Sequence, residues 1–189
     1  MKRFAALALF ALIAYAPAAS AQLFGQEKSD PQNTLVIETT KGQVVIMLRP
    51  DLAPKHAERL KQLARDGFYN NVPFHRVMLG FMAQTGDGQN RDGTGKSRYP
   101  DLPGEFSTVP FARGIVGMAR SQSRDSANSQ FFIMYDSSPS LNGQYTVVGQ
   151  VISGMEAVDG LNKGPSSLNG RVSDPDSIIT VHVAADMKR

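Results

Sequence analysis

The sequence predicts a mainly β domain, built as an antiparallel barrel or a sandwich. Short runs of β-branched and aromatic residues recur along the chain, and turn residues separate them. Only one long segment, which starts at Pro54, has the spacing of an amphipathic helix. A chain of 189 residues, 41% of them hydrophobic, is the size of one ordinary globular domain.

The first 21 residues have the pattern of an export signal. Lys2 and Arg3 precede an apolar run over 4–16, and Pro17 leads into the small residues 19–21. The run of about 13 residues is shorter than the roughly 20 that a membrane-spanning helix needs. We therefore expect a signal peptide over 1–21, a bacterial periplasmic location and no stable membrane insertion of the cleaved chain.

The ordered domain is expected to span 34–189. Residues 22–33 are polar and show no periodicity, which predicts a flexible lead-in. Two β-branched runs, 35–37 and 44–48, flank a Thr-Thr-Lys-Gly turn, as in a hairpin. The helix from Pro54 carries apolar residues on one face and ends near Gly67.

The remaining pattern is mostly strands. A second, shorter helix is expected over 155–161, and a closing strand over 178–183 that returns to the first strand would remove both edges of the sheet. The strands expected between the two helices are 74–77, 81–85, 114–118, 130–134 and 146–152.

Composition excludes several classes of site. The chain has no cysteine, which rules out disulfides, a Cys-ligated zinc site and a cysteine nucleophile. A formal charge of +3 from scattered residues does not favour nucleic-acid binding. His56, His75 and His182 lack the spacing of metal ligands, and His56 is expected on an exposed helix face. We expect no metal and no cofactor.

The Gly-rich stretch 86–95 predicts a polar surface loop whose residues do not pack inside. Gly95-Lys96-Ser97 resembles the end of a phosphate-binding loop, but Asn90 stands where that motif requires glycine. An alignment with a calcium loop places Gly88 at the first carboxylate position. Both matches fail.

A concentration of Phe, Met and Gln with a single Arg occupies three successive strands: 74–77, 80–84 and 129–132. Alternate strand residues share a face, so Arg76 is expected in phase with Phe74, and Met82 with Gln84. These aromatics could be core residues, with Arg76 a solvated edge charge, or they could form a site. Periodicity alone favours the first interpretation.

The segment 74–87, Phe-His-Arg-Val-Met-Leu-Gly-Phe-Met-Ala-Gln-Thr-Gly-Asp, resembles the signature of the cyclophilin family of peptidyl-prolyl cis-trans isomerases. Segments 129–133 and 141–149 resemble two further family segments, and 93–97 resembles the family's Gly-rich loop. The resemblance covers about 35–183. It implies a closed eight-stranded antiparallel β-barrel capped by two α-helices.

The resemblance also implies the roles of nine residues. Arg76 would be the central catalytic group, with Gln84 binding the substrate backbone and Phe81 in the wall of the proline pocket; these three form the predicted catalytic set. The predicted substrate-binding residues are Met82, Ala119, Arg120, Phe132, Leu141 and Tyr145.

Two positions depart from the best-known family members. Tyr145 stands where many have His, and it keeps an aromatic wall with a hydroxyl donor. Ser140 stands where those members have Trp, so weak cyclosporin binding is expected. The expected partners are proline-containing polypeptides, and the expected state is a monomer because a closed barrel has no free edge.

Isomerisation makes and breaks no covalent bond, which agrees with the lack of nucleophile and metal motifs. Two other function classes stay open. A cyclophilin-like barrel could bind proline-containing segments without turnover, although such a binder would not need Arg76. An envelope-interaction protein would be favoured if residues 22–33 were a docking tail.

Overall fold

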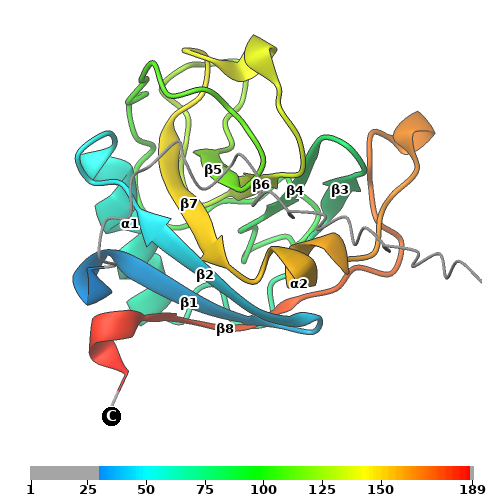
Figure 1. The fold of residues 1–189 in the computed structure, drawn as a ribbon, viewed down its shortest axis with the longest axis horizontal. Coiled ribbons are helices and arrows are strands. Elements are labelled where there is room, and N and C mark those ends of the chain that lie inside the picture. The colour runs from blue at the N-terminus through cyan, green and yellow to red at the C-terminus, as the bar shows by residue number, and fades with distance from the viewer. Residues whose placement is uncertain (1–29, 188–189) are drawn as a thin grey trace, which may run out of the picture.

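The computed structural model describes residues 30–187, and the predicted signal peptide 1–21 lies outside this range. Eight antiparallel strands and two α-helices confirm the mainly β prediction (Figure 1). The strands are β1 (Thr34–Thr39), β2 (Gly42–Leu48), β3 (Arg76–Met78), β4 (Met82–Thr85), β5 (Ile115–Met118), β6 (Phe131–Met134), β7 (Val147–Ser153) and β8 (Ile178–Val183). The helices are α1 (Pro54–Arg65) and α2 (Met155–Asp159).

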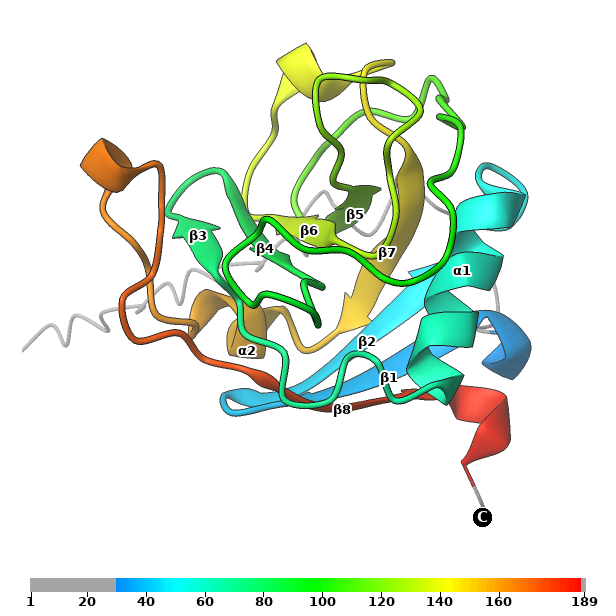
Figure 2. The same cartoon turned by 180° about the vertical axis from the view of Figure 1, so that it is seen from behind.

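All strands form one sheet in the order β3-β4-β6-β5-β7-β2-β1-β8. The predicted hairpin pairs β1 with β2, with Thr39 opposite Gly42, and β8 returns to β1 as predicted. Gly42 has φ +126°, a backbone conformation that glycine adopts without strain. The helices α1 and α2 lie near opposite ends of β1, β2 and β8 (Figures 1 and 2).

The prediction of a closed barrel is wrong, because no ladder joins β3 to β8 at the two ends of the sheet. One isolated bridge, Pro73 to Ser177, and single backbone hydrogen bonds such as Phe74 N to Asp176 O span the gap. Pro73 has no N–H to donate, and β3 is only three residues long, so a regular ladder cannot form there. The sheet is an open half-barrel.

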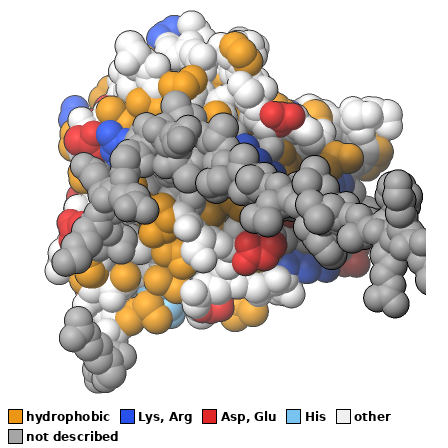
Figure 3. All heavy atoms as spheres, viewed as in Figure 1, with side chains coloured by type: hydrophobic (Ala, Val, Ile, Leu, Met, Phe, Trp, Pro, Cys, Tyr) orange, Lys and Arg blue, Asp and Glu red, His pale blue; other side chains and the backbone are white. Residues whose placement is uncertain are grey.

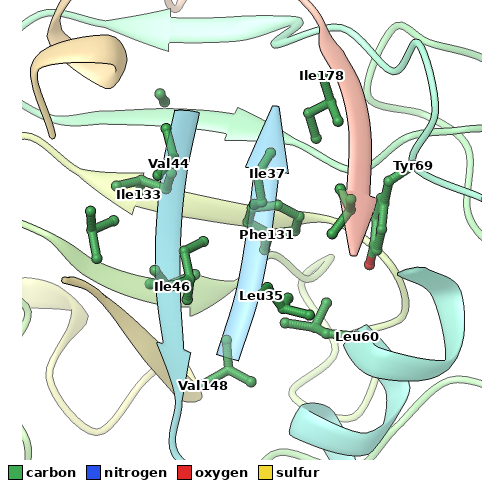
Figure 4. Packing of buried hydrophobic residues seen from close by; sticks show 14 of the residues in the cluster. Leu35, Ile37, Val44, Ile46, Leu60, Tyr69, Phe131, Ile133, Val148 and Ile178 are labelled. Atoms are coloured by element: carbon green, nitrogen blue, oxygen red, sulfur yellow. The ribbon is translucent and has the colours of Figure 1, made fainter. Parts of the chain in front are cut away.

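The main core fills the space between the sheet and α1. Leu35 and Ile37 of β1, with Val44 and Ile46 of β2, point into it (Figure 4). Leu60 of α1 packs against them. Tyr69 meets Phe131 edge to face at 5.7 Å between ring centroids and donates its hydroxyl to Ser129 O.

An ordered turn directly precedes β1. Pro31–Asn33 form a 3-10 turn that Asp30 caps by accepting a hydrogen bond from Gln32 N. Lys61 Nζ of α1 then donates to Asn33 Oδ1. The end of the predicted flexible lead-in is therefore tied to the first helix, whereas residues 22–29 lie outside the described range.

The predicted exposure of His56 is wrong. Its side chain is fully buried, and Nδ1 lies 2.6 Å from Glu105 Oε2. Glu105 also accepts hydrogen bonds from the backbone N–H groups of Lys55 and His56, which caps α1 from a distant loop. The helical period predicted the apolar face, but it could not show that the 98–114 loop covers the opposite side.

Candidate active site

Strand alternation divides the β4-β6-β5 part of the sheet between two faces. Ala83, Phe131, Ile133 and Val116 point into the main core. Their neighbours point the other way, into a second buried cluster that comprises Met82, Phe111, Ile115, Phe132, Met134 and Val147. This second face carries the candidate site.

One row of residues crosses four strands on that face. Arg76 pairs with Gln84, Gln84 with Phe132, and Phe132 with Gly117. A Cβ at Gly117 would lie 2.4 Å from Cζ of Phe132 and 2.6 Å from Phe111. Only glycine at position 117 lets the Phe132 ring lie this close to β5.

All nine predicted site residues line one cavity of about 120 Å³, here called the arginine pocket. Its lining comprises Arg76, Phe81, Met82, Gln84, Ala119, Arg120, Phe132, Leu141 and Tyr145. Phe111 stacks on Phe132 with ring centroids 5.7 Å apart, and Tyr145 meets Phe132 edge to face at 5.8 Å. The aromatic wall is therefore supported from both sides.

Arg76 is held by one edge of its guanidinium. Nε donates to Asn169 O at 2.9 Å, and Nη2 donates to Asn169 Oδ1 at 2.8 Å. The Nη1 contacts are longer, at 3.4 Å to Gln84 Oε1 and 3.8 Å to Met82 Sδ. Partial burial lowers the pKa of Arg76, but a guanidinium stays protonated in proteins. The guanidinium is therefore a fixed cation, and its weakly bonded nitrogen, Nη1, lies at the pocket.

Sequence reasoning missed Asn169. It has φ +54°, and the segment that carries it lies beside β3 in both views (Figures 1 and 2). The Asn169-Gly170 pair is a turn signal that tolerates this conformation. That signal locates a turn, but the contact with Arg76, 93 positions away, depends on the fold.

The prediction that Phe74 and Arg76 lie on the same face of a strand is wrong. Phe74 packs in the main core, whereas Arg76 lines the pocket. The regular strand begins only at Arg76, so the alternation rule does not extend back to Phe74. Ser140 lies in the exposed 3-10 turn Pro139–Leu141, next to Leu141 of the pocket.

A second, larger cavity of about 370 Å³, here called the polar cavity, adjoins the arginine pocket. The two share Gln84, Ala119 and Arg120. Arg120 lies over the Tyr145 ring at 4.5 Å and donates to Gln144 O. The polar cavity is lined by Gln84, Gly93, Thr94, Gly95, Lys96, Asp101, Ala119, Arg120, Ser121, Ser126, Asn128, Ser129 and Gln130.

The prediction that no residue of the 86–95 loop packs inside is wrong, because Gly86, Asp87 and Gly95 are buried. Asp87 is fully buried, and the loop folds around its carboxylate. The backbone N–H groups of the loop supply its hydrogen-bond donors, which composition alone does not reveal.

Two features are absent from residues 30–187. Within this range no group of three or more His, Cys, Asp or Glu residues is placed to hold a metal ion. The same part of the chain contains no helix that is long and apolar enough to cross a membrane. On the uncovered part of the face in Figure 3, blue Lys and Arg side chains do not merge into one patch.

Known proteins are similar to this chain in sequence and in fold. A family model described as "Cyclophilin type peptidyl-prolyl cis-trans isomerase/CLD" matches residues 34–183. A "Probable peptidyl-prolyl cis-trans isomerase" of Brucella suis is 58% identical over 170 residues, which cover 85% of this chain and 87% of the relative.

Two solved structures are similar. The cyclophilin AquaCyp293 from Hirschia baltica aligns with a TM-score of 0.77 and 26% identity, covering 85% of this chain and 77% of the other. A Cryptosporidium parvum cyclophilin, solved in the presence of the dipeptide Ala-Pro, aligns with a TM-score of 0.73 and 30% identity, covering 79% of this chain and 98% of the other. With the family model, they show that this chain belongs to the cyclophilin-type peptidyl-prolyl cis-trans isomerases.

Proposed function

We propose that the arginine pocket binds the proline ring of an X-Pro segment and that Arg76 stabilises the twisted amide. One observation carries this proposal. Two short hydrogen bonds to Asn169 fix one edge of the guanidinium, whereas the Nη1 contacts at 3.4 and 3.8 Å are long enough to be exchanged for a substrate. The arginine is oriented without its pocket-facing donor being tightly bonded.

The chemistry requires such a donor. The planar peptide bond has a rotation barrier of about 18–20 kcal/mol because the C–N bond has double-bond character. As the bond twists, the prolyl nitrogen regains a lone pair that can accept a hydrogen bond. A charge-assisted bond contributes about 1.5–3 kcal/mol, which corresponds to roughly 10- to 150-fold in rate.

The apolar wall contributes in a second way. The planar amide is more charge-separated than the twisted one, so a dry surface of Phe81, Met82 and Phe132 favours the twisted form. Gln84 faces the same pocket and would hold the substrate backbone. Ala119 N–H already donates to Gln130 O, so a main-chain bond from Ala119 to a peptide would use its carbonyl oxygen.

We further propose that the clients are exported proteins. The basis is the basic, apolar and small-residue pattern of 1–21. Cleavage would give a periplasmic enzyme whose N-terminus is Gln22. N-terminal sequencing after cell fractionation tests this, and an uncleaved cytoplasmic chain would contradict it.

The predictions of a monomer and of weak cyclosporin binding also stay proposals. Because the sheet is open, a closed barrel cannot be the reason for expecting a monomer. The expectation rests on the backbone bonds that cover β3, Val77 N to Gly170 O and Gly164 N to Val77 O. Size-exclusion chromatography and a cyclosporin titration test the two proposals.

A catalysis assay separates an isomerase from a binding module. Cis-trans exchange of an Ala-Pro peptide is measured with the wild type and with Arg76→Ala, and peptide binding is titrated in parallel. We expect kcat/KM to fall about 10- to 150-fold in the variant while binding is largely kept. Arg113→Ala is the matched control, because Arg113 is bonded to Asp159 outside the pocket.

Wild-type turnover by Arg76→Ala would overturn the proposed role of Arg76. Peptide binding by the wild type without any turnover would favour the binding module instead.

A further inference from the structure

Asp87 is a buried carboxylate that the proposed chemistry does not use. It follows β4 two residues after Thr85, and its side chain is fully buried. Among residues 30–187 no Lys or Arg forms an ion pair with it. A buried charge must be compensated by other groups, and here the compensation comes from the backbone.

Five backbone N–H groups of the following loop donate to this carboxylate. Oδ1 accepts from Gln89 N at 3.1 Å and Asn90 N at 2.8 Å. Oδ2 accepts from Asp92 N at 3.2 Å, Gly93 N at 2.9 Å and Gly95 N at 3.0 Å. Burial would raise the pKa of Asp87, but these donors lower it to about 2.

The loop fits the carboxylate too closely for larger residues. A Cβ at Gly95 would lie 2.3 Å from Asp87 Oδ1, and Gly93 has φ +96°. The positions of the Gly93 and Gly95 carbonyl groups are therefore fixed by Asp87.

Those two carbonyl groups orient Gln130. Its Nε2 donates to Gly93 O at 3.0 Å and to Gly95 O at 2.8 Å. Because both hydrogens of the amide face the loop, its Oε1 faces Gln84 and accepts from Gln84 Nε2 at 2.9 Å. The Oε1 atom of Gln84 is thereby directed at Arg76 Nη1, 3.4 Å away.

We infer that Asp87 is a positioning residue for catalysis: through the Gly93 and Gly95 carbonyls, Gln130 and Gln84 it places the acceptor beside Arg76 Nη1, while Asn169 holds the other edge of the guanidinium. The direction of each hydrogen bond is set by the one before it, since an amide that turned around would bring two donors or two acceptors together. This inference rests on the proposed role of Arg76. Its consequence is that a carboxylate outside both cavities influences kcat.

The test uses Asp87→Asn in the full chain, with Asp92→Asn as the matched control. Asp92 is in the same loop and carries the same charge, but it accepts only from Thr94. For Asp87→Asn we expect kcat to fall about three- to tenfold and KM to change less than twofold, because the loss is confined to the transition state. Asp92→Asn should retain wild-type kcat.

A double-mutant cycle separates positioning from a general loop effect. In an Arg76→Ala background, Asp87→Asn should lower kcat by less than twofold, because the group it positions is gone. An equal fall in both backgrounds, a change in KM alone, or equal effects of Asp87→Asn and Asp92→Asn would each overturn the inference.

A second variant decides the question if Asp87→Asn does not fold. Gln130→Met keeps the side-chain length but removes all three hydrogen bonds that the Gln130 amide makes in the relay. It should lower kcat in the wild type and not in Arg76→Ala, and additive losses would overturn the inference. Wild-type activity of Arg76→Ala alone would instead refute the proposed role of Arg76, so the two failures are distinguishable.

Discussion

The arginine pocket and the polar cavity lie side by side, yet they are built differently. The pocket takes four of its nine lining residues from strands of one sheet, Arg76, Met82, Gln84 and Phe132, and Met82 and Phe132 belong to the second buried cluster. The polar cavity is walled mostly by loops, and its shape depends on hydrogen bonds such as those around Asp87. The comparison indicates that packing shapes the reactive pocket and that polar loops orient the groups at its border.

Phe132→Ala should have the largest effect, since it removes a buried ring that contacts both Phe111 and Tyr145. We expect a loss of about 3–5 kcal/mol in the free energy of unfolding. Ser126→Ala, in the polar cavity, should cost about 1 kcal/mol through its lost hydrogen bonds. Urea unfolding of both variants measures the difference. Equal losses would show that core packing contributes no more to the pocket than loop hydrogen bonds contribute to the polar cavity.

Asn169→Gly should have a smaller effect, and on activity rather than on folding. Glycine accepts φ +54° and keeps the carbonyl that binds Nε, so only the 2.8 Å bond from Nη2 is lost. We expect kcat/KM to fall about five- to tenfold with the free energy of unfolding within about 1 kcal/mol of the wild type. An unchanged kcat/KM would show that Arg76 is oriented without this side chain.

Asp87 should make the stability of the fold sensitive to acid. Its pKa is lowered to about 2 in the folded chain, below the ordinary 3.8, so it stabilises the fold above about pH 4. That stability is lost as the pH falls from about 4 towards 2. Thermal unfolding from pH 5 to pH 2 should show a smaller fall in Tm for Asp87→Asn than for the wild type, and parallel curves would contradict this origin.

The smallest expected effect is that of pH on turnover. No proton is transferred in the proposed reaction, and Arg76 stays charged from mildly acid to mildly basic pH. We expect kcat/KM to be nearly constant between mildly acid and mildly basic pH at a temperature where the protein is folded. A sharp bell-shaped profile would indicate proton transfer and would contradict the mechanism.

The sequence predicted the pocket better than its surroundings. Strand alternation placed Met82 and Gln84 on one face, and the resemblance selected the nine residues that line the cavity. Alternation failed before Arg76, because Pro73 and the short β3 interrupt regular pairing. It also could not show the open sheet, which results from that same interruption.

Contacts between distant loops were not predictable from the sequence. Asn169 reaches Arg76, and Glu105 reaches buried His56, only through the path of the folded chain. Asp87 was assigned to a surface loop because its neighbours are polar, although their backbone N–H groups make its burial possible. Periodicity reports which face a side chain occupies, and it carries no information on backbone donors.

The proposed mechanism requires Arg76 to accelerate rotation of the bound X-Pro bond. NMR exchange spectroscopy on a saturating Ala-Pro peptide measures the cis-trans rate on the enzyme itself, separately from binding. For Arg76→Ala we expect an on-enzyme rate about 10- to 150-fold below the wild type, with the peptide still bound. An unchanged on-enzyme rate in that variant would contradict this mechanism.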